Sequence, residues 1–432
     1  MRDDVPYSDW QGSLDEEANP CENFYKFACG RYEKEHKILF ELLFKLNLAI
    51  ASARPYLELC LVDAILDTTP TNSTAVQKMR SYRDVFVPIK NIPLAPQYKR
   101  WVAEKTANLF PVVANHVFVH YCFGPDVLKR VQEIATEIKF TVAVMIYEAD
   151  WLDSKTKDAA LDKLAKMREY VGAIDIVINA RQLDILHESL EIKPKEPLFS
   201  MEQKIKKFNT KKFGAPELDG FGVTEVNAFN ELTSNVVFII AGFINQHNFD
   251  LTNAAAINYG RIGSVIGHEI FHAFDDTGIQ FDGKGTQRNW WTAKSLVEYK
   301  KRAQCYVDQY GKQIDTKTGK HLNGTLTLGE NIADNNGMKA AYRTYLRHLH
   351  EQRLLQVPGY SQYDFKKAFF ISYGTLWCYS GSKVVHDYLL KNAHPPFEFR
   401  VNVPLENFQD FADVFNCSTS SPMNPANKCT LF

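Results

Sequence analysis

The chain has 432 residues, of which 45% are hydrophobic and 23% are charged, and this composition is typical of a globular protein long enough for two or more domains. Its 50 basic and 51 acidic residues nearly cancel, which excludes a strong overall field that would attract nucleic acid or an anionic membrane. The longest apolar stretches, 39–51 and 235–242, are too short or too interrupted by charge to cross a bilayer, so we expect no transmembrane segment.

The eight cysteines include no CxxC pair, a pattern that favours disulfide bonds over zinc knuckles or thiol redox chemistry. The first residues lack the apolar core of a signal peptide. Asparagines in N-x-S/T sequons, which can accept a glycan in an exported protein, are Asn72, Asn323 and Asn416. We therefore predict an extracellular glycoprotein whose export signal lies upstream of this sequence.

Apolar residues recur at helical spacing from 41 to 172, most clearly in 126–152 and 154–172. Ser154 and Gly172 suit the two ends of one helix. The region carries no reactive group of residues, so we predict a helical scaffold or lid.

Between 173 and 226 the helical periodicity fades, which predicts a join between two units. The residues that interrupt it are Pro194, Pro197 and Pro216. Two short strands rich in Val, Ile and Phe are then predicted at 221–229 and 234–242, with a turn at 230–234. Helical spacing returns from 261, so the fold class is mainly α with a small β element.

The stretch VIGHEIFHAFDD, at 265–276, places two histidines four residues apart around a glutamate. A rotation of about 400° between His268 and His272 puts both imidazoles on one helix face, where they can bind one zinc ion. Glu269 can then reach a water on that ion, as in the H-E-x-x-H zinc peptidases. The composition gives only about 0.02 chance matches to this pattern. The alternative is an amphipathic helix whose histidines bond to neighbouring groups.

A catalytic zinc ion needs a third protein ligand and leaves its fourth position to water. The extended motif H-E-x-x-H-x-x-G-x-x-H would require Gly at 275 and His at 278, where this chain has Asp275 and Gly278. Glu330 and Asp334 offer carboxylates four residues apart on a later predicted helix. One could bind the metal while the other accepts the second ring N–H of a ligand histidine. Their spacing also fits two carboxylates on a solvated helix face.

Several segments together resemble the neprilysin and endothelin-converting-enzyme family of zinc metallopeptidases. In chain order they are PCENFYKFACG (20–30), VNAF (226–229), VIGHEIFHAFDD (265–276), GENIAD (329–334), HPPFEFR (394–400) and FNCSTSSPMNPANKCTLF (415–432). The resemblance implies a thermolysin-like (gluzincin) catalytic domain and a reduced helical domain, in a shortened member of the family. The implied divisions are an N-terminal segment tied to the catalytic domain (1–40), a helical lid (41–172), a linker (173–220) and the catalytic domain (221–432).

The same resemblance implies the roles of individual residues. One zinc ion would lie on His268, His272 and Glu330, with Glu269 as the general base. Asp275 and Asp334 would support the ligand histidines, and Asp334 is also assigned to the catalytic group. His394 would donate to the oxyanion. The residues assigned to the substrate are Asn227, Ala228 and Arg400 for its backbone, and Val265, Phe249 and Trp377 for a large apolar side chain.

The family pattern would pair the cysteines as Cys21–Cys417, Cys29–Cys378 and Cys305–Cys429. Cys60 and Cys122 have no counterpart in that pattern, so their pairing stays open. The helical region is shorter than in full-length relatives, and Asn230 replaces an aromatic residue after N-A-F.

We therefore expect a zinc-dependent metalloendopeptidase that cuts oligopeptides before large apolar residues. The alternative is a zinc-retaining homologue that binds peptides with weak or no turnover because its lid is incomplete.

Overall fold

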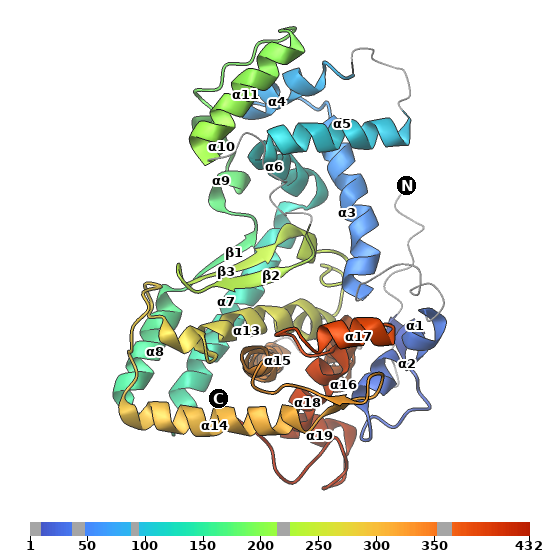
Figure 1. The fold of residues 1–432 in the computed structure, drawn as a ribbon, viewed down its shortest axis with the longest axis vertical. Helices are drawn as coiled ribbons and strands as arrows, with labels where there is room; N and C mark the ends of the chain where they lie inside the picture. The colour runs from blue at the N-terminus through green and yellow to red at the C-terminus, as the bar shows by residue number, and fades with distance from the viewer. Residues whose placement is uncertain (1–9, 37–47, 88–94, 214–224, 352–364) are drawn as a thin grey trace.

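A computed structural model describes most of the chain as a mainly helical protein with two small sheets, as predicted (Figure 1). The described residues are 10–36, 48–87, 95–213, 225–351 and 365–432. Pro216 and the first part of the strand predicted at 221–229 lie outside them. None of the described helices has both the length and the apolar character needed to cross a membrane.

The upper part of Figure 1 is a group of helices around an apolar core. They are α3 (Leu48–Leu66), α4 (Thr74–Arg83), α5 (Pro96–Leu109), α6 (Pro111–Cys122), α9 (Asp175–Ile178), α10 (Ala180–Leu186) and α11 (Leu198–Phe213). Several of these helices begin at residues that favour a helix N-terminus. Ser73 caps α4 by accepting from the Val76 N–H, and proline occupies the first turn of α5 and α6. The segment 173–213, expected within the linker, instead supplies three of these helices, which pack on α4, α5 and α6.

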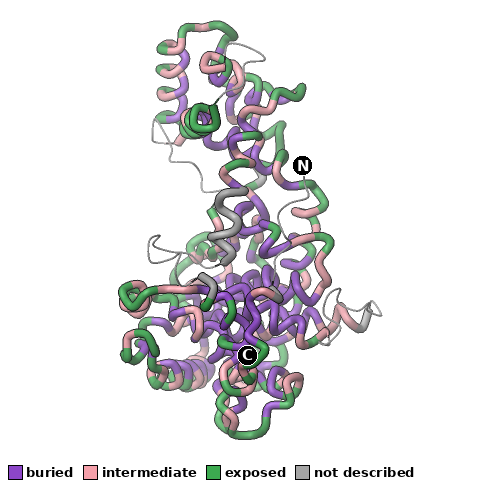
Figure 2. The backbone as a smooth tube through the Cα atoms, turned by 90° about the vertical axis from the view of Figure 1, so that its right-hand side faces the viewer, coloured by how far each residue is buried: buried purple, intermediate pink, exposed green. Residues whose placement is uncertain are grey.

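The lower part holds the other helices, and Figure 2 shows its dense buried interior. They are α1 (Trp10–Ser13), α2 (Phe24–His36), α7 (Pro125–Glu148), α8 (Ser154–Lys166), α12 (Ala255–Asn258), α13 (Ser264–Phe271), α14 (Ala293–Gly311), α15 (Leu328–Glu351), α16 (Phe365–Leu376), α17 (Lys383–Leu389), α18 (Phe397–Glu406) and α19 (Gln409–Phe415). Short turns are η1 (Ala241–Phe243), η2 (Tyr259–Gly263), η3 (His272–Phe274) and η4 (Gly278–Gln280). Together these elements surround the pair α13 and α15.

Two glycines allow α13 and α15 to touch backbone to backbone. A Cβ on Gly267 would lie 2.4 Å from the Gly337 carbonyl oxygen, and a Cβ on Gly337 would lie 2.3 Å from the His268 nitrogen. No side chain fits at such separations. The close crossing brings the HEIFH segment, at the end of α13 and the start of η3, against α15.

The main sheet has the strand order β1-β3-β2, with β1 (Arg168–Gly172) parallel and β2 (Ala228–Glu231) antiparallel to β3 (Val236–Ile240). The single helix predicted at 154–172 is wrong, because α8 stops at Lys166 and β1 follows it. Pairing with the distant β3 outweighs the local helical pattern here. The N-cap is Asp153 rather than Ser154, and Gly172 (φ 83°) ends a strand. A further hairpin joins β4 (Ile314–Asp315) and β5 (Lys320–His321).

Strand β2 also begins and ends later than predicted, so the turn lies at 232–235. Helix α7 packs on α13 and α15, where the Thr141 and Thr344 hydroxyls are 2.6 Å apart. Residues 125–172 therefore pack with the lower part, although the predicted lid extended to 172.

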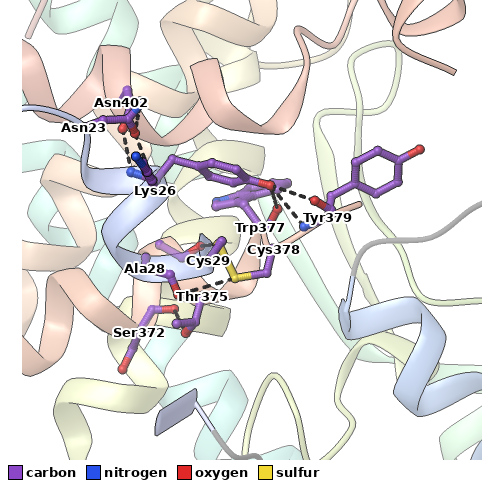
Figure 3. The surroundings of a disulfide bond; sticks show 12 residues. Asn23, Lys26, Ala28, Cys29, Ser372, Thr375, Trp377, Cys378, Tyr379 and Asn402 are labelled. Atoms are coloured by element: carbon purple, nitrogen blue, oxygen red, sulfur yellow. Dashed lines mark hydrogen bonds between the residues drawn. A yellow bond between two sulfur atoms is a disulfide. The ribbon is translucent and has the colours of Figure 1, made fainter. Parts of the chain in front are cut away.

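Four disulfides are present. Three are the predicted pairs Cys21–Cys417, Cys29–Cys378 and Cys305–Cys429. The fourth joins Cys60 on α3 to Cys122 at the end of α6, which settles the pairing left open above. Figure 3 shows the Cys29–Cys378 bridge with Trp377 and Tyr379 beside it.

Candidate metal centre

His268 on α13 and His272, which follows α13 as the first residue of η3, turn their rings toward each other. The Nε2 atoms of His268 and His272 are 2.9 Å apart, and all residues of α13 are buried. Glu330 comes from the first turn of α15, with Oε2 3.3 Å from His268 Nε2 and Oε1 3.8 Å from His272 Nε2. Two imidazole nitrogens and one carboxylate thus converge, which is a donor set that zinc commonly takes.

A carboxylate stands behind each of these histidines. Asp334 Oδ1 lies 2.8 Å from His268 Nδ1, and Asp275 Oδ2 lies 2.7 Å from His272 Nδ1. Asp275 also accepts from the backbone N–H groups of Thr277 (2.9 Å) and Gly278 (2.5 Å). Because an ionised carboxylate can only accept, each ring holds its proton at Nδ1 and turns the Nε2 lone pair toward the other ring.

The residues present fit a bound cation. Two lone pairs at 2.9 Å repel unless a positive charge lies between them, and Glu330 Oε2 is buried without a hydrogen-bond partner. A zinc ion would satisfy all three atoms. A proton can take the same place, so binding of the metal competes with protonation.

The pKa values at the centre reflect this concentration of carboxylates. Although burial favours the neutral ring of His268, Asp334 and Glu330 raise its pKa to about 10. Burial alone would raise the pKa of Glu330, but the two histidines hold it well below its usual range. Both shifts favour a positive charge between the rings.

Glu269 lies beside the donor atoms, with Oε1 4.0 Å from His268 Nε2. Its side chain is 7% exposed, and burial raises the pKa of the carboxyl group. The Asn230 side chain donates to the Glu269 carbonyl oxygen at 2.7 Å and so ties β2 to α13. Asn230 was not predicted as a site residue; its polar side chain directly after VNAF was the available signal.

Arg400 on α18 is buried behind the centre. Its Nε and Nη2 donate to Asp334 at 2.8 and 2.7 Å, and Nη2 lies 3.7 Å from Glu330 Oε2. The guanidinium group lies 4.1 Å from the centre of the Trp377 ring. In the structure Arg400, for which a substrate carbonyl was predicted as the partner, anchors Asp334.

His394 occupies the more open side of the centre. Its side chain is 51% exposed, and Nε2 lies 3.1 Å from Glu330 Oε2. Although half of the side chain is exposed, the covered part of the ring and the charge of Arg400 lower the pKa of His394 to about 4. The neutral imidazole can still donate one N–H to a group bound beside Glu330.

The other predicted substrate residues lie at varied positions. Asn227 is exposed just before β2 and accepts from the Ala228 N–H at 2.9 Å, while Ala228 is half-buried. Val265 is buried one turn ahead of His268 on α13. Phe249 is buried in the loop between η1 and α12, where its N–H donates to Asn245. In the described sheet β2 pairs only with β3, so its other edge carries no strand.

Known proteins match both parts of the chain. Two family models, each described as peptidase family M13, match residues 48–174 and 227–431. An endothelin-converting enzyme homolog of Locusta migratoria is 34% identical over 343 residues, covering 77% of this chain and 46% of that protein. Neprilysin of Homo sapiens is 34% identical over 335 residues, covering 74% and 44%.

Among solved structures, the zinc metalloprotease Zmp1 of Mycobacterium tuberculosis in its open state has a TM-score of 0.63 and 26% identity. It covers 80% of this chain, and the match extends over 53% of that chain. An inhibitor complex of the same protein gives a TM-score of 0.60 at 25% identity, with 78% and 52% covered. The chain spans about half the length of the relatives it matches.

Proposed function

This chain belongs to peptidase family M13, and from that premise we propose that it is a zinc metalloendopeptidase acting on internal bonds of oligopeptides. The observation that carries the proposal is the convergence of His268, His272 and Glu330, with the Glu269 carboxylate beside them. An amphipathic helix with incidental histidines would not need a buried carboxylate from a second helix at the same point.

His268, His272 and Glu330 would hold one zinc ion, which as a Lewis acid lowers the pKa of a water and polarises a carbonyl group. Glu269 takes a proton from the attacking water and later delivers it to the leaving amine. Burial raises the pKa of Glu269, which favours acceptance of that proton. Asp334 and Asp275 keep the proton of each ligand histidine at Nδ1.

The substrate would lie along the free edge of β2 in extended form, with Asn227 and Ala228 contacting its backbone. His394, on the open side of Glu330, would donate to the oxygen of the reacting carbonyl. Trp377, Val265 and Phe249 would form an apolar pocket for the residue after the cut bond. Arg400, stacked on Trp377, would hold a substrate carbonyl.

We also propose that the protein acts outside the cell. Four disulfides among the described residues suit an oxidising compartment. Asn72, Asn323 and Asn416 are all exposed, as glycan acceptors must be.

One observation favours the second candidate, a peptide-binding protein that retains zinc with little turnover. The His394 side chain beside Glu330 is 51% exposed, and a site that is open to solvent excludes water less completely. The donor atoms and Glu269 nevertheless lie together, which favours the peptidase.

Incubation with a mixed peptide library, followed by mass spectrometry, separates these candidates. We expect new internal cleavage products that disappear when a chelator removes zinc and return when zinc is added. Retention of peptides without cleavage would support the binding protein. A purified protein that binds no zinc would contradict both.

A further inference from the structure

Lys163 on α8 is a buried lysine outside the set of residues described above. Its side chain is almost fully covered, with 1% of the residue exposed. The ammonium group donates to the carbonyl oxygens of Ala273 (2.7 Å), Gly278 (2.6 Å) and Phe281 (2.7 Å). All three acceptors belong to the segment that follows α13.

Three short bonds use the full donor capacity of an ammonium group. The ring faces of Phe274 and Trp290 lie 5.7 and 5.9 Å from Nζ and add favourable contacts for the charge. Burial lowers the pKa of Lys163 to about 8, while Asp275 and Asp282 oppose this change. The ammonium group therefore stays charged at neutral pH. Its charge is stabilised by the backbone carbonyl dipoles of a single segment.

That segment carries Asp275, the acceptor for His272 Nδ1. Lys163 holds the carbonyl groups of Ala273 and Gly278, which lie on either side of Asp275 in the chain. The Gly278 N–H also donates to Asp275. A line of direct contacts thus runs from the ammonium through Gly278 and Asp275 to His272.

Lys163 is itself fixed from the sheet side. The Asn235 side chain, just before β3, donates to the Lys163 carbonyl oxygen (2.9 Å) and to the Gly283 carbonyl oxygen (3.1 Å). Helix α8, the sheet and the segment after α13 therefore meet at this lysine.

We propose that Lys163 is a positioning residue of the metal centre, holding residues 273–281 so that Asp275 keeps His272 oriented toward the ion. The inference rests on the proposed zinc site. It adds a layer beyond the carboxylates that contact the ligand histidines, and it draws on a helix that lies more than 100 residues earlier in the chain.

The test is the zinc dissociation constant of Lys163→Met, measured by chelator competition at fixed pH. Loss of a partner that orients a metal ligand costs about 10–100-fold in affinity, and we expect a weakening of about tenfold, near the lower end. Lys166→Met is the matched control, since Lys166 is on the same helix but pairs with Asp162 at the surface. Its affinity should stay within twofold of that of the wild type.

A merely structural lysine would lower stability without changing zinc affinity. Leu183→Ala, a buried residue of α10 in the upper helices, provides a destabilised control. We expect Leu183→Ala to melt at a lower temperature yet bind zinc normally. Cobalt substitution adds a spectroscopic readout, because a reoriented His272 in Lys163→Met should alter the visible spectrum. An unchanged affinity and spectrum in Lys163→Met would overturn the proposal.

A double-mutant cycle tests the route through Asp275. If Lys163 acts by holding Asp275, Lys163→Met should cost little further affinity in an Asp275→Asn protein. Additive losses would contradict this route.

The wild-type protein provides a test that does not depend on a variant that folds. If Lys163 strengthens zinc binding, zinc must in turn stabilise the contacts of Lys163. Zinc should therefore slow the acylation of Lys163 by an amine-reactive ester and leave the acylation rate of Lys166 unchanged. Equal labelling of Lys163 with and without zinc would overturn the proposal. A wild type that binds no zinc would instead contradict the proposed function, so the two failures are distinguishable.

Discussion

The buried histidines His116 and His187 of the upper helices and the two motif histidines of the metal centre lie in opposite environments. In the upper helices, His116 Nδ1 lies 2.6 Å from the Val177 carbonyl oxygen and His187 Nδ1 lies 2.9 Å from that of Leu183. Each ring faces one backbone acceptor, and burial lowers the pKa of both. At the metal centre, carboxylates raise the pKa of His268 and His272 in spite of burial.

The contrast shows what separates a structural histidine from a ligand. A structural ring is satisfied by one neighbour and stays neutral. Each ring of the metal centre has a carboxylate at Nδ1, and its Nε2 faces the Nε2 of the other ring. A cation between the two Nε2 atoms removes the repulsion between their lone pairs. Burial alone does not distinguish the two cases.

The largest effect expected in the lower part comes from Glu269→Gln. Removal of the general base should lower kcat by about 10²–10⁴-fold, because no other carboxylate is assigned to the proton of the attacking water. Zinc content should stay at the wild-type value, since Glu269 is not a ligand. Cleavage of a fluorogenic peptide, with the metal content measured on the same sample, checks both; unchanged turnover would remove Glu269 from its role.

His394→Ala should have the next largest effect. Loss of an oxyanion donor typically costs about 10²–10³ in rate, and we expect kcat to fall while zinc affinity changes little. The matched variant is His120→Ala, which removes an exposed histidine from α6 in the upper part. If His394→Ala and His120→Ala had the same kcat, His394 would have no role as an oxyanion donor.

The Cys60–Cys122 bridge tests whether the upper helices are held independently of the centre. A closed loop of this length, with a sequence separation of 62, predicts a loss of about 2–4 kcal/mol in the free energy of unfolding for the double Cys→Ser variant. Zinc affinity should not change. Denaturant unfolding and chelator competition measure these separately, and a loss of zinc would show that the two parts are coupled.

The smallest expected effect is a pH dependence of the upper helices. The pKa of His187 is lowered by burial, so the unfolded chain binds a proton more readily than the folded one near pH 6. Stability is therefore present above the ordinary histidine pKa and is lost as the pH falls below it. We expect faster hydrogen exchange in α10 at pH 5 than pH 7 after correction for intrinsic rates, and a smaller difference in His187→Gln. If the wild type and His187→Gln showed the same change in exchange rate between pH 5 and pH 7, His187 would not be the source of the pH dependence.

Local patterns singled out residues that the structure brings together, and the reasons are physical. His268 and His272 were found because four residues make about one helical turn, and Glu330 with Asp334 because the same spacing recurs on α15. Three disulfides followed from the family resemblance and are confirmed.

Features that depend on distant pairing were missed. Strand β1 forms by pairing with β3, and Arg168 of β1 lies opposite Val236 of β3. In the sequence, the helical pattern of 154–166 runs into β1, and no local signal marks the change from helix to strand. Lys163 likewise looks like an ordinary helix residue until the segment at 273–281 folds onto it. Pro194 and Pro197 made the segment 173–213 look like a linker, although it contains helices that are stabilised by packing.

The Cys29–Cys378 bridge determines what happens when a protease cuts the chain. A protease that cuts any single bond between residues 30 and 377 leaves two fragments that remain covalently joined by this bridge. The Tyr25 hydroxyl of the N-terminal fragment still lies 3.5 Å from the Trp377 carbonyl oxygen and accepts from the Tyr379 N–H at 3.0 Å. Such a nicked molecule would migrate as one species without reductant and as two with it. Clipping alone therefore does not release the N-terminal helix α2, whose release also requires reduction of the bridges to Cys378 and Cys417.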